Sequence, residues 1–425
     1  MSISPPASDL NGDDLPEIEF VEAAPELLDG PPPVEPGTVP PDVAESTKLH
    51  QWLLLGAGYA HLQVVRWWGR RPIPGVRLTL ISAFDRAVYS GHLPDVLAGT
   101  RPVADMQIDL SALCQRSGVQ LMVDRAVALD VGRRAVTMAH QPEQSFDLAS
   151  INIGCVPADE RLWQTHRTLV GLQPLPTFVS RFEARLAELV SQWRMAEHDE
   201  AMQLAVIGGG PAGVELALAL AARCQREQLP AQLRLLERGE EILPGYPLAV
   251  VRRARELLFR RGIAIRTRAT VAECDEDFAT ELVLEGGARL RVDLAIWAAG
   301  AAPPAVLRQF QLPRSPAGFL KIRPTLQVDA AVPVFAAGSI AEWPARALPK
   351  SGVSAVRQAR ILWENLRRWQ AGRELIEYRP RRTALSLLNT ADGRALLHWN
   401  GWSCHNRLAG WLKRRLDADF VRQFR

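Results

Sequence analysis

Residues 204–224, LAVIGGGPAGVELALALAARC, decide which fold this chain adopts. An apolar run that suits a buried strand leads into Gly208, Gly210 and Gly213, and an apolar helical pattern follows. A glycine turn between a strand and a helix brings backbone N–H groups and the positive end of the helix dipole to one point. Such a turn can hold a pyrophosphate, so the stretch predicts a dinucleotide-binding site.

An acidic residue stands where such a site needs one. Glu237 ends the next strand pattern, 24 residues after Gly213. A carboxylate at this point accepts hydrogen bonds from the adenosine ribose hydroxyls of a dinucleotide and repels a 2′-phosphate. Glu237 therefore predicts a preference for NADH over NADPH, and Arg238 beside it acts in the opposite direction.

A second stretch repeats the pattern less regularly. Residues 52–68, WLLLGAGYAHLQVVRWW, supply Gly56 and Gly58, but His61 holds the third glycine position. The strand pattern that follows ends in Ser82 instead of an acidic residue. The order of strand, turn and helix is kept, so this stretch predicts a second dinucleotide site. We call residues 56–61 the first cradle and residues 208–213 the second cradle.

The chain also contains an internal repeat on the scale of a domain. DLASINIGCVP (147–157) and DLAIWAAGAAPP (293–304) are strand patterns that end in a glycine, Gly154 or Gly300, and then proline. Each lies well downstream of one cradle. We therefore predict an α/β fold with two Rossmann-like dinucleotide-binding domains, one inserted in the other, and a small C-terminal α+β segment.

The first 48 residues differ from the rest in composition. They hold eleven acidic residues, ten prolines and a single basic residue, Lys48. Their apolar surface is too small to offset the entropy of ordering, so residues 1–47 are predicted to be disordered; they also lack the pattern of a secretion signal. Residues 49–425 carry 49 basic against 36 acidic residues, which favours anionic ligands.

Spacing argues against several other classes of protein. The five cysteines form no CxxC pair and the eight histidines show no metal-ligand spacing, so we expect neither a redox dithiol nor a metal site. No recognised nucleic-acid-binding module accompanies the arginines, and no apolar run is long enough to span a membrane. We therefore expect no nucleic-acid partner and a cytoplasmic protein.

Four short motifs add to the two cradles: YSGHLPD (89–95), ILPGYP (242–247), PKSGVSAVRQ (349–358) and DADFVRQF (417–424). With them, residues 50–425 resemble the flavoproteins with two dinucleotide-binding domains, which include type II NADH dehydrogenases and pyridine nucleotide–disulfide reductases. The subgroup found fused to selenide, water dikinase is the most similar. A histidine in the third glycine position, as at His61, is usual in that subgroup.

The resemblance implies FAD in the first cradle and NAD(P)H in the second. It places a loop with Tyr89 near the flavin and Gly338 beside the ribityl chain, followed here by Ser339 where aspartate is usual. The cofactor-binding residues that we expect are Gly56, Gly58, His61, Ser82, Tyr89, Ser90, Gly91, Gly154, Gly208, Gly210, Gly213, Glu237, Gly300, Gly338, Ser339 and Ser351.

The resemblance also implies two catalytic residues. The helix that begins near Ser351 would point its positive end at the O2–N1 edge of the flavin, where Lys350 would stabilise the charge of the reduced form. Glu215, in the first turn after the second cradle, would bind near the nicotinamide carboxamide. A solvent-facing glutamate is the alternative for Glu215.

These implications divide the chain into domains. We expect an FAD-binding domain formed by residues 48–160 and 290–375, and an NAD(P)H-binding domain formed by residues 161–289. Residues 376–425 would form a C-terminal interface segment with a basic amphipathic helix.

The two cofactors together predict an oxidoreductase that passes hydride from NADH to flavin and then to a small acceptor. Disulfide reductases carry a cysteine pair close to the first cradle, and this chain has none there, so a quinone is the acceptor that we expect. Two alternatives stay open. One is a reductase in selenium or sulfur metabolism, and the other is a non-catalytic FAD-binding scaffold, in which Ser339 and His92 would mark lost turnover.

The C-terminus predicts a helix with an apolar row at Leu408, Leu412, Leu416, Phe420 and Phe424. We expect this row to pack as core. The alternative is a helix in the interface of a membrane, because tryptophans and arginines accompany the row. Peripheral contact with the inner face of the cytoplasmic membrane and a homodimer are both left open.

Overall fold

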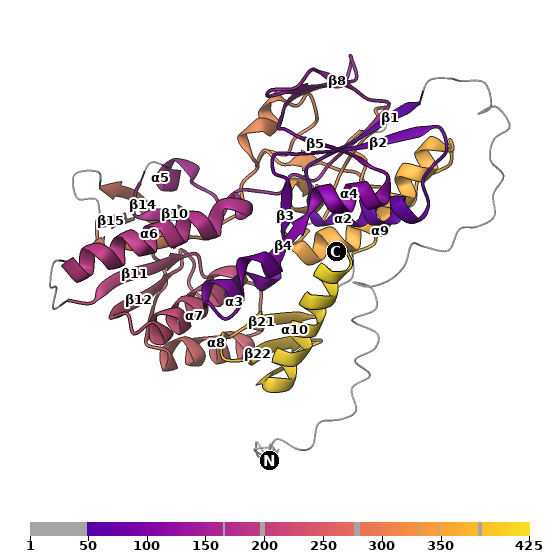
Figure 1. Ribbon diagram of the computed structural model, residues 1–425. Helices are drawn as coiled ribbons and strands as arrows, with labels where there is room; N and C mark the ends of the chain where they lie inside the picture. Colours follow the sequence, from indigo (N-terminus) through magenta and orange to yellow (C-terminus); the bar gives the residue numbers. More distant parts are fainter. Residues whose placement is uncertain are drawn as a thin grey trace, which may run out of the picture.

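The computed structural model describes residues 49–425, except residues 165, 196–199, 276–280, 330, 347 and 381–384. The segment 1–47, predicted to be disordered, lies outside the described residues. Figure 1 shows two α/β units side by side, with the C-terminal segment in yellow beside both. Among the described helices, none combines the length and apolarity that crossing a membrane requires.

The first unit is built on a five-stranded parallel sheet with strand order β19-β9-β1-β2-β5. Its central strand β1 is apolar, as a strand of a parallel sheet must be when helices and a small second sheet cover its faces. The strands are β1 (His50–Leu55), β2 (Val76–Ser82), β5 (Gln120–Val123), β9 (Leu148–Ile151) and β19 (Val334–Ala336). The other elements are α2 (Tyr59–Arg70), α4 (Leu110–Ser117), α9 (Gly352–Gln370), and the small sheet of β6 (Ala126–Asp130), β7 (Ala135–Met138) and β8 (Gln144–Ser145).

The second unit repeats this plan with the order β10-β17-β11-β12-β13. Its sheet contains β10 (Leu169–Gly171), β11 (Met202–Ile207), β12 (Ala231–Leu236), β13 (Ile263–Arg266) and β17 (Leu294–Trp297). Around it lie α6 (Leu175–Met195), α7 (Pro211–Arg226), α8 (Leu248–Arg260), and the small sheet of β14 (Val271–Asp275), β15 (Glu281–Leu284) and β16 (Arg289–Arg291). The predicted fold class is confirmed, because β19 returns to the first sheet after the whole second unit.

One predicted domain boundary is wrong. We expected the first unit to resume at residue 290, but β17 pairs with β10 and β11 in the second sheet. Its register aligns Ala205 with Ala295 and Ile207 with Trp297, which makes β17 an interior strand. The chain therefore returns to the first unit only after residue 297.

The loop between β2 and β5 brings the two units together. It forms β3 (Arg86–Val88), a short 3-10 turn (Ser90–His92), α3 (Leu93–Leu97) and β4 (Gln107–Asp109). α3 packs directly on α7, the helix of the second cradle. The loop that the sequence places near the flavin thus contacts the helix that should hold the nicotinamide nucleotide.

The C-terminal segment closes this junction. Its elements are β21 (Ser386–Asn389), β22 (Ala395–Trp399), β23 (Trp402–Asn406) and α10 (Arg407–Arg422). Successive side chains of β22 face opposite sides: Leu396 enters the core of the second unit, and Leu397 packs under Ala409 of α10. The side chain of Asn406 caps α10 by accepting from the Ala409 N–H at 2.8 Å.

The predicted apolar row on this helix divides. Phe420 and Phe424 are buried in the core of the first unit, where Phe420 stacks on Tyr89 with ring centroids 4.5 Å apart. Leu408, at the other end of the row, is exposed. Each step of four residues turns about 40° further around a helix, so a row of five cannot stay on one face. Core packing is therefore confirmed for the two phenylalanines and wrong for Leu408.

We predict that Phe420→Ala destabilises the protein by about 3–5 kcal/mol, because it leaves a cavity between α10 and the aromatic side chains of the first unit. Thermal unfolding should shift to lower temperature, and flavin should be released earlier in the melt. The control is Trp411→Ala on the exposed side of the same helix, which should unfold like wild type. Equal melting of both variants would contradict this packing.

Candidate active site

The second cradle has the shape that a pyrophosphate needs. Gly208 follows β11 with φ +111°, and Gly210 is the N-cap of α7. The first helical hydrogen bond runs from the Val214 N–H to the Gly210 carbonyl at 3.0 Å. The N–H groups of Ala212 and Gly213, which precede it, therefore point out of the helix end. A Cβ at Gly210 would meet no protein atom within 4 Å, so the cradle is open beside Gly210, as a pyrophosphate-binding turn requires.

Glu237 lies against this cradle. Its carboxylate accepts hydrogen bonds from the Gly209 N–H at 2.6 Å and the Gly239 N–H at 2.7 Å. Arg238 beside it is exposed. The structure thus brings the acidic residue to the turn, as predicted, and its selection of NADH stays a prediction.

The first cradle uses its third position differently. Gly213 in the second cradle must lack a side chain, because a Cβ there would overlap the Gly208 carbonyl. His61 instead donates from Nδ1 to the Gly56 carbonyl at 2.7 Å, and its Nε2 accepts from the Ser150 hydroxyl at 2.8 Å. Complete burial lowers the pKa of His61 to about 4, so the ring is neutral. His61 therefore fixes the turn to the neighbouring strand β9.

Asn152 supports the first cradle, and sequence reasoning missed it. Its Oδ1 accepts from the Ala60 N–H at 3.1 Å and the His61 N–H at 3.4 Å, and its Nδ2 donates to the Ala337 carbonyl at 2.7 Å. The side chain is buried and touches the positions where Gly58 and Gly338 lack a Cβ. It thus joins the first cradle to the turn after β19.

A comparison of the two repeats could have found it. Asn152 and Ser150 in the first repeat correspond to Ala298 and Ile296 in the second. The first unit therefore has polar side chains at two positions where the second has apolar ones. These are the residues that bind the first turn of α2 and the ring of His61.

The glycines that end the repeats occupy equivalent places. Gly154 follows β9 with φ +78°, and Gly300 follows β17 with φ +62°. Beyond them, the segments pair: the Val156 N–H donates to the Ala302 carbonyl at 2.9 Å, and the reverse bond is 2.8 Å. These two hydrogen bonds connect the two units near their predicted cofactor sites.

Two serines predicted to bind FAD are engaged in local hydrogen bonds. The hydroxyl of Ser82 donates to the Phe84 carbonyl at 2.8 Å, so it shapes the turn after β2. Ser339 Oγ accepts from the Cys155 N–H at 2.9 Å, next to Gly338 with φ +77°. Their contacts with a cofactor stay predictions.

The contacts of Lys350 are with residues of the first unit. Its Nζ donates to the Ala341 carbonyl at 2.9 Å and lies 3.7 Å from the centre of the Phe319 ring. Burial lowers its pKa. Ser351 caps α9 through a hydrogen bond from the Ser354 N–H at 3.3 Å, so the predicted start of this helix is right. The catalytic role of Lys350 stays a prediction.

A buried cation connects three elements: the loop between β2 and β5, which we call the flavin loop, the second cradle helix α7 and the C-terminal helix α10. Lys413 of α10 donates from Nζ to Asp417 at 3.0 Å and to the Gly91 carbonyl at 3.4 Å, and it lies 3.9 Å from Glu215. Tyr89 donates its hydroxyl proton to the other oxygen of Asp417 at 2.8 Å. Three predicted site residues, Tyr89, Gly91 and Glu215, therefore meet around one ammonium group.

Ser90, the third predicted residue of this loop, binds the first cradle instead. Its N–H donates to the Tyr59 hydroxyl at 2.7 Å, and its own hydroxyl lies 3.0 Å from the same oxygen. Tyr59 directly follows Gly58 in the first cradle. The loop is thus fixed to the first cradle through Ser90 and to the C-terminal helix through Tyr89.

The pKa values of Glu215 and Lys413 depend on burial and on the charges around them. Burial raises the pKa of Glu215 to about 7, against the opposing effects of Lys413 and of the Asn389 N–H, which Glu215 accepts at 2.6 Å. Burial by itself would lower the pKa of Lys413, but Asp417 and Glu215 outweigh it and raise that pKa. Glu215 can therefore change its protonation near neutral pH, while Lys413 stays charged.

Asn389 and Asp95 extend the network. The side-chain N–H of Asn389 donates to Asp95 on α3 at 2.7 Å, so β21 links α3 to Glu215 on α7. The sequence has no local signal for Lys413 or Asn389, and Asp417 enters only as the first residue of the motif DADFVRQF, which gives it no role. Their partners lie far away along the chain, and an i,i+4 pair such as Lys413–Asp417 is common on exposed helices.

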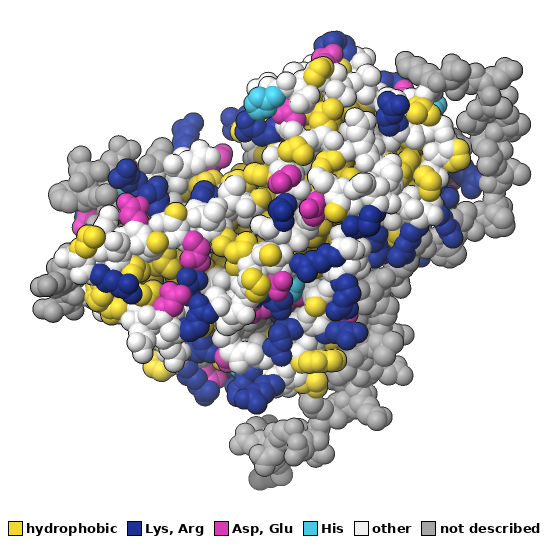
Figure 2. Space-filling view, in the orientation of Figure 1, with side chains coloured by type: hydrophobic (Ala, Val, Ile, Leu, Met, Phe, Trp, Pro, Cys, Tyr) yellow, Lys and Arg dark blue, Asp and Glu magenta, His cyan; other side chains and the backbone are white. Residues whose placement is uncertain are grey.

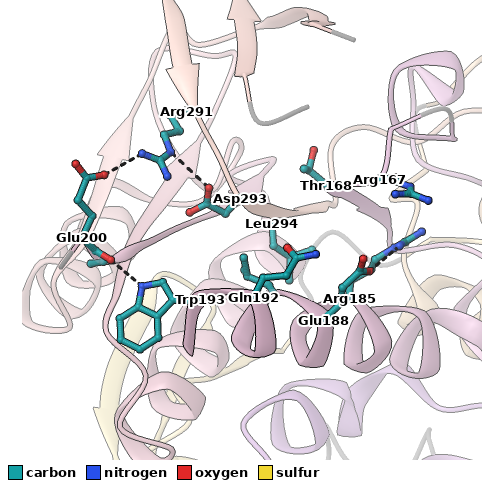
Figure 3. A pocket seen from close by; sticks show the side chains of 12 residues that line it. Arg167, Thr168, Arg185, Glu188, Gln192, Trp193, Glu200, Arg291, Asp293 and Leu294 are labelled. Carbon is teal, nitrogen blue, oxygen red and sulfur yellow. Dashed lines mark hydrogen bonds and ion pairs between the residues drawn. The ribbon is translucent and has the colours of Figure 1, made fainter. Parts of the chain in front are cut away.

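One cavity in the described part of the chain lies away from the junction. It has a volume of about 310 Å³ and is lined by Thr168, Gln192, Trp193, Arg291 and Asp293 (Figure 3). These residues surround α6 and the amino ends of β10 and β17, whereas nucleotides bind at the carboxyl ends of parallel strands. Arg291 is paired with Glu200 and Asp293 at this edge. The cavity is therefore not the dinucleotide site.

Comparison with known proteins agrees with this geometry. The model of the pyridine nucleotide-disulphide oxidoreductase family matches residues 50–359, which include both cradles. The chain belongs to this family. It is an oxidoreductase that uses FAD and a pyridine nucleotide. The narrower resemblance to the subgroup fused to selenide, water dikinase stays a prediction.

Individual relatives are distant. A demethylphylloquinone reductase of Synechocystis is 25% identical, over 81% of this chain and 85% of that protein. The structure resembles NDH2 of Plasmodium falciparum in complex with NADH, with a TM-score of 0.75 and 12% identity over 89% of this chain and 98% of that chain. It also resembles sulfide:quinone oxidoreductase of Aquifex aeolicus, with a TM-score of 0.71 and 15% identity over 87% and 90%. The two solved structures support the fold alone.

We predict that Asn152→Asp weakens FAD binding at least about tenfold, because it places a carboxylate at the helix end where the FAD pyrophosphate should bind. The helix itself should not suffer, since aspartate also caps helices well. Asn152→Ala is the comparison variant: it removes all of these side-chain contacts without adding charge and should still keep more flavin than Asn152→Asp. Flavin fluorescence during titration of the apoprotein measures both affinities, and equal affinities would show that Asn152 lies away from the pyrophosphate.

Proposed function

We propose that this chain is an NADH:quinone oxidoreductase, with FAD in the first cradle and NADH in the second. The observation that carries the proposal is the junction around Lys413, where Glu215 of the second cradle helix lies beside the flavin loop. Two dinucleotides extended from the two cradles would bring their reactive rings toward this junction. Hydride transfer needs this proximity.

The chain's own groups would divide the work. The N–H groups at the start of α7 hold the NADH pyrophosphate, Glu237 accepts from its ribose, and Glu215 orients the nicotinamide carboxamide. The positive charge of Lys413 favours negative charge on the flavin side of the junction. FAD, when bound, supplies the hydride acceptor. The packed rings of Tyr59, Tyr89 and Phe420 exclude water from this side.

A quinone is the acceptor that the printed functions of relatives favour. The relative from Synechocystis reduces demethylphylloquinone by its name, and a type II NADH:quinone oxidoreductase of Haemophilus influenzae is 26% identical over a third of each chain. All five cysteines are free, and no two of them stand in CxxC spacing in the sequence. The support for the sulfur or selenium alternative is likeness of fold, for example to sulfide:quinone oxidoreductase. A non-catalytic scaffold is the third candidate.

A lipid-soluble acceptor requires access to a membrane. We therefore propose peripheral contact with the cytoplasmic face of a membrane, through the C-terminal segment, whose Trp402, Leu408 and Trp411 are exposed. Co-sedimentation with vesicles tests this contact. A homodimer also stays a prediction, which sedimentation equilibrium would test.

An anaerobic titration tests the proposed function. One equivalent of NADH should bleach the flavin absorbance of the wild type, NADPH should do so more slowly, and a water-soluble quinone should restore the colour. Gly210→Val is the matched control, because its side chain would project into the open space of the second cradle without meeting protein. This variant should keep FAD and be bleached by dithionite, but hardly by NADH.

Two results would contradict the proposal. Flavin that NADH cannot reduce would indicate the non-catalytic scaffold. If NADH reduces the flavin, and polysulfide or selenite but no quinone reoxidises it, the protein is the sulfur or selenium reductase.

A further inference from the structure

Helix α8 of the second unit presents an unusual face to solvent. Leu248 is 58% exposed and Phe259 is 82% exposed, which is rare for such large apolar side chains. Arg252 and Arg255 lie between them in the sequence, and the spacing 248, 252, 255, 259 places all four on one side of the helix. The buried side, with Val251, packs on the core of the unit.

This face adjoins the exposed start of α10. Arg261, directly after α8, forms an ion pair of 3.2 Å with Asp392 in the turn between β21 and β22. Arg414 of α10 donates to the carbonyl of Gly393 in the same turn at 3.0 Å. One turn therefore connects the end of α8 that carries Phe259 to the part of α10 that carries Trp411, which is 54% exposed.

Arginines outnumber acidic residues on the combined surface, where Glu256, Glu241 and Asp392 pair with some of them. Residues 248–261 contain five arginines and one acidic residue, Glu256. The start of α10 adds the exposed Arg407, Arg414 and Arg415. In Figure 2, dark-blue side chains with yellow ones beside them follow the lower edge of the molecule, where α8 and α10 lie in Figure 1. Exposed aromatic and aliphatic side chains among arginines are typical of a surface that enters a lipid headgroup region.

We propose that α8 of the second dinucleotide-binding unit docks on an anionic lipid surface together with the start of α10. The apolar side chains would enter the headgroup layer, and the arginines would pair with lipid phosphates. A second copy of the chain fits less well, because a symmetric contact would oppose two surfaces of the same positive charge. The nucleotide-binding unit would then touch the membrane directly, beyond the contact of the C-terminal segment. This inference rests on the proposed lipid-soluble acceptor.

Vesicle co-sedimentation of Leu248→Ser/Phe259→Ser tests the proposal. Binding to vesicles of phosphatidylcholine with phosphatidylglycerol should weaken about tenfold, because two apolar side chains no longer enter the lipid. Wild-type binding should also weaken in high salt and on pure phosphatidylcholine. Met195→Ser is the matched control: Met195 is likewise 82% exposed but lies at the end of α6, and its variant should bind like wild type.

The double variant must remain a folded enzyme for this comparison. Because both side chains are exposed, its melting temperature, flavin content and NADH:ferricyanide turnover should equal those of wild type. Unchanged vesicle binding by the folded double variant would overturn the proposal. A wild type and a Met195→Ser variant that form dimers, with a double variant that is a monomer, would overturn it as well. Wild type that reduces quinone in detergent but binds no vesicle would also overturn it, while the proposed function would stand. If NADH cannot reduce the flavin of the wild type, the proposed function itself is contradicted.

Discussion

The ammonium group of Lys413 is the constraint on which the junction depends. A buried cation is costly unless carboxylates and carbonyls surround it, and here Asp417, Glu215 and the Gly91 carbonyl do so. Each of these partners comes from a different part of the chain: α10 itself, the second cradle helix and the flavin loop. Removing one partner of such a pair typically costs about 3–5 kcal/mol, so the three parts are held in one arrangement.

This constraint explains why a site built from two repeats also needs the C-terminus. The repeats supply two cradles and bring α3 against α7. The C-terminal sheet of β21, β22 and β23, together with α10, completes the surface at this contact. Tyr89 is fixed on one side by Asp417 and on the other by the stacked ring of Phe420. The segment that closes this junction also carries the exposed Trp402 and Trp411, so under the proposed function one element would serve both catalysis and access to a lipid-soluble acceptor.

The sequence predicts the parts of this molecule that depend on short-range pattern. Strand, glycine turn and helix are contiguous in both cradles, so their existence and order could be predicted, and Glu237 follows at a regular distance. Pairing between distant strands could not: β17 resembles β9 in sequence, yet only its register with β11 shows which sheet it joins. Lys413 and Asn389 depend on contacts across more than 170 residues, for which no local pattern exists. Asn152 lies between these cases, because alignment of the two repeats would have exposed it.

Glu215 is proposed to bind the nicotinamide beside the flavin, and the rest of the proposed mechanism depends on this contact. The most direct test is the second-order rate constant for flavin reduction by NADH, measured by anaerobic stopped flow across pH in wild type and Glu215→Gln. Burial raises the pKa of Glu215 to about 7, and the ionised carboxylate accepts the carboxamide N–H more strongly than the protonated acid does. The wild-type rate constant should therefore rise as pH passes through about 7, and that of the glutamine variant should stay level. The same inflection in both proteins would contradict the claim.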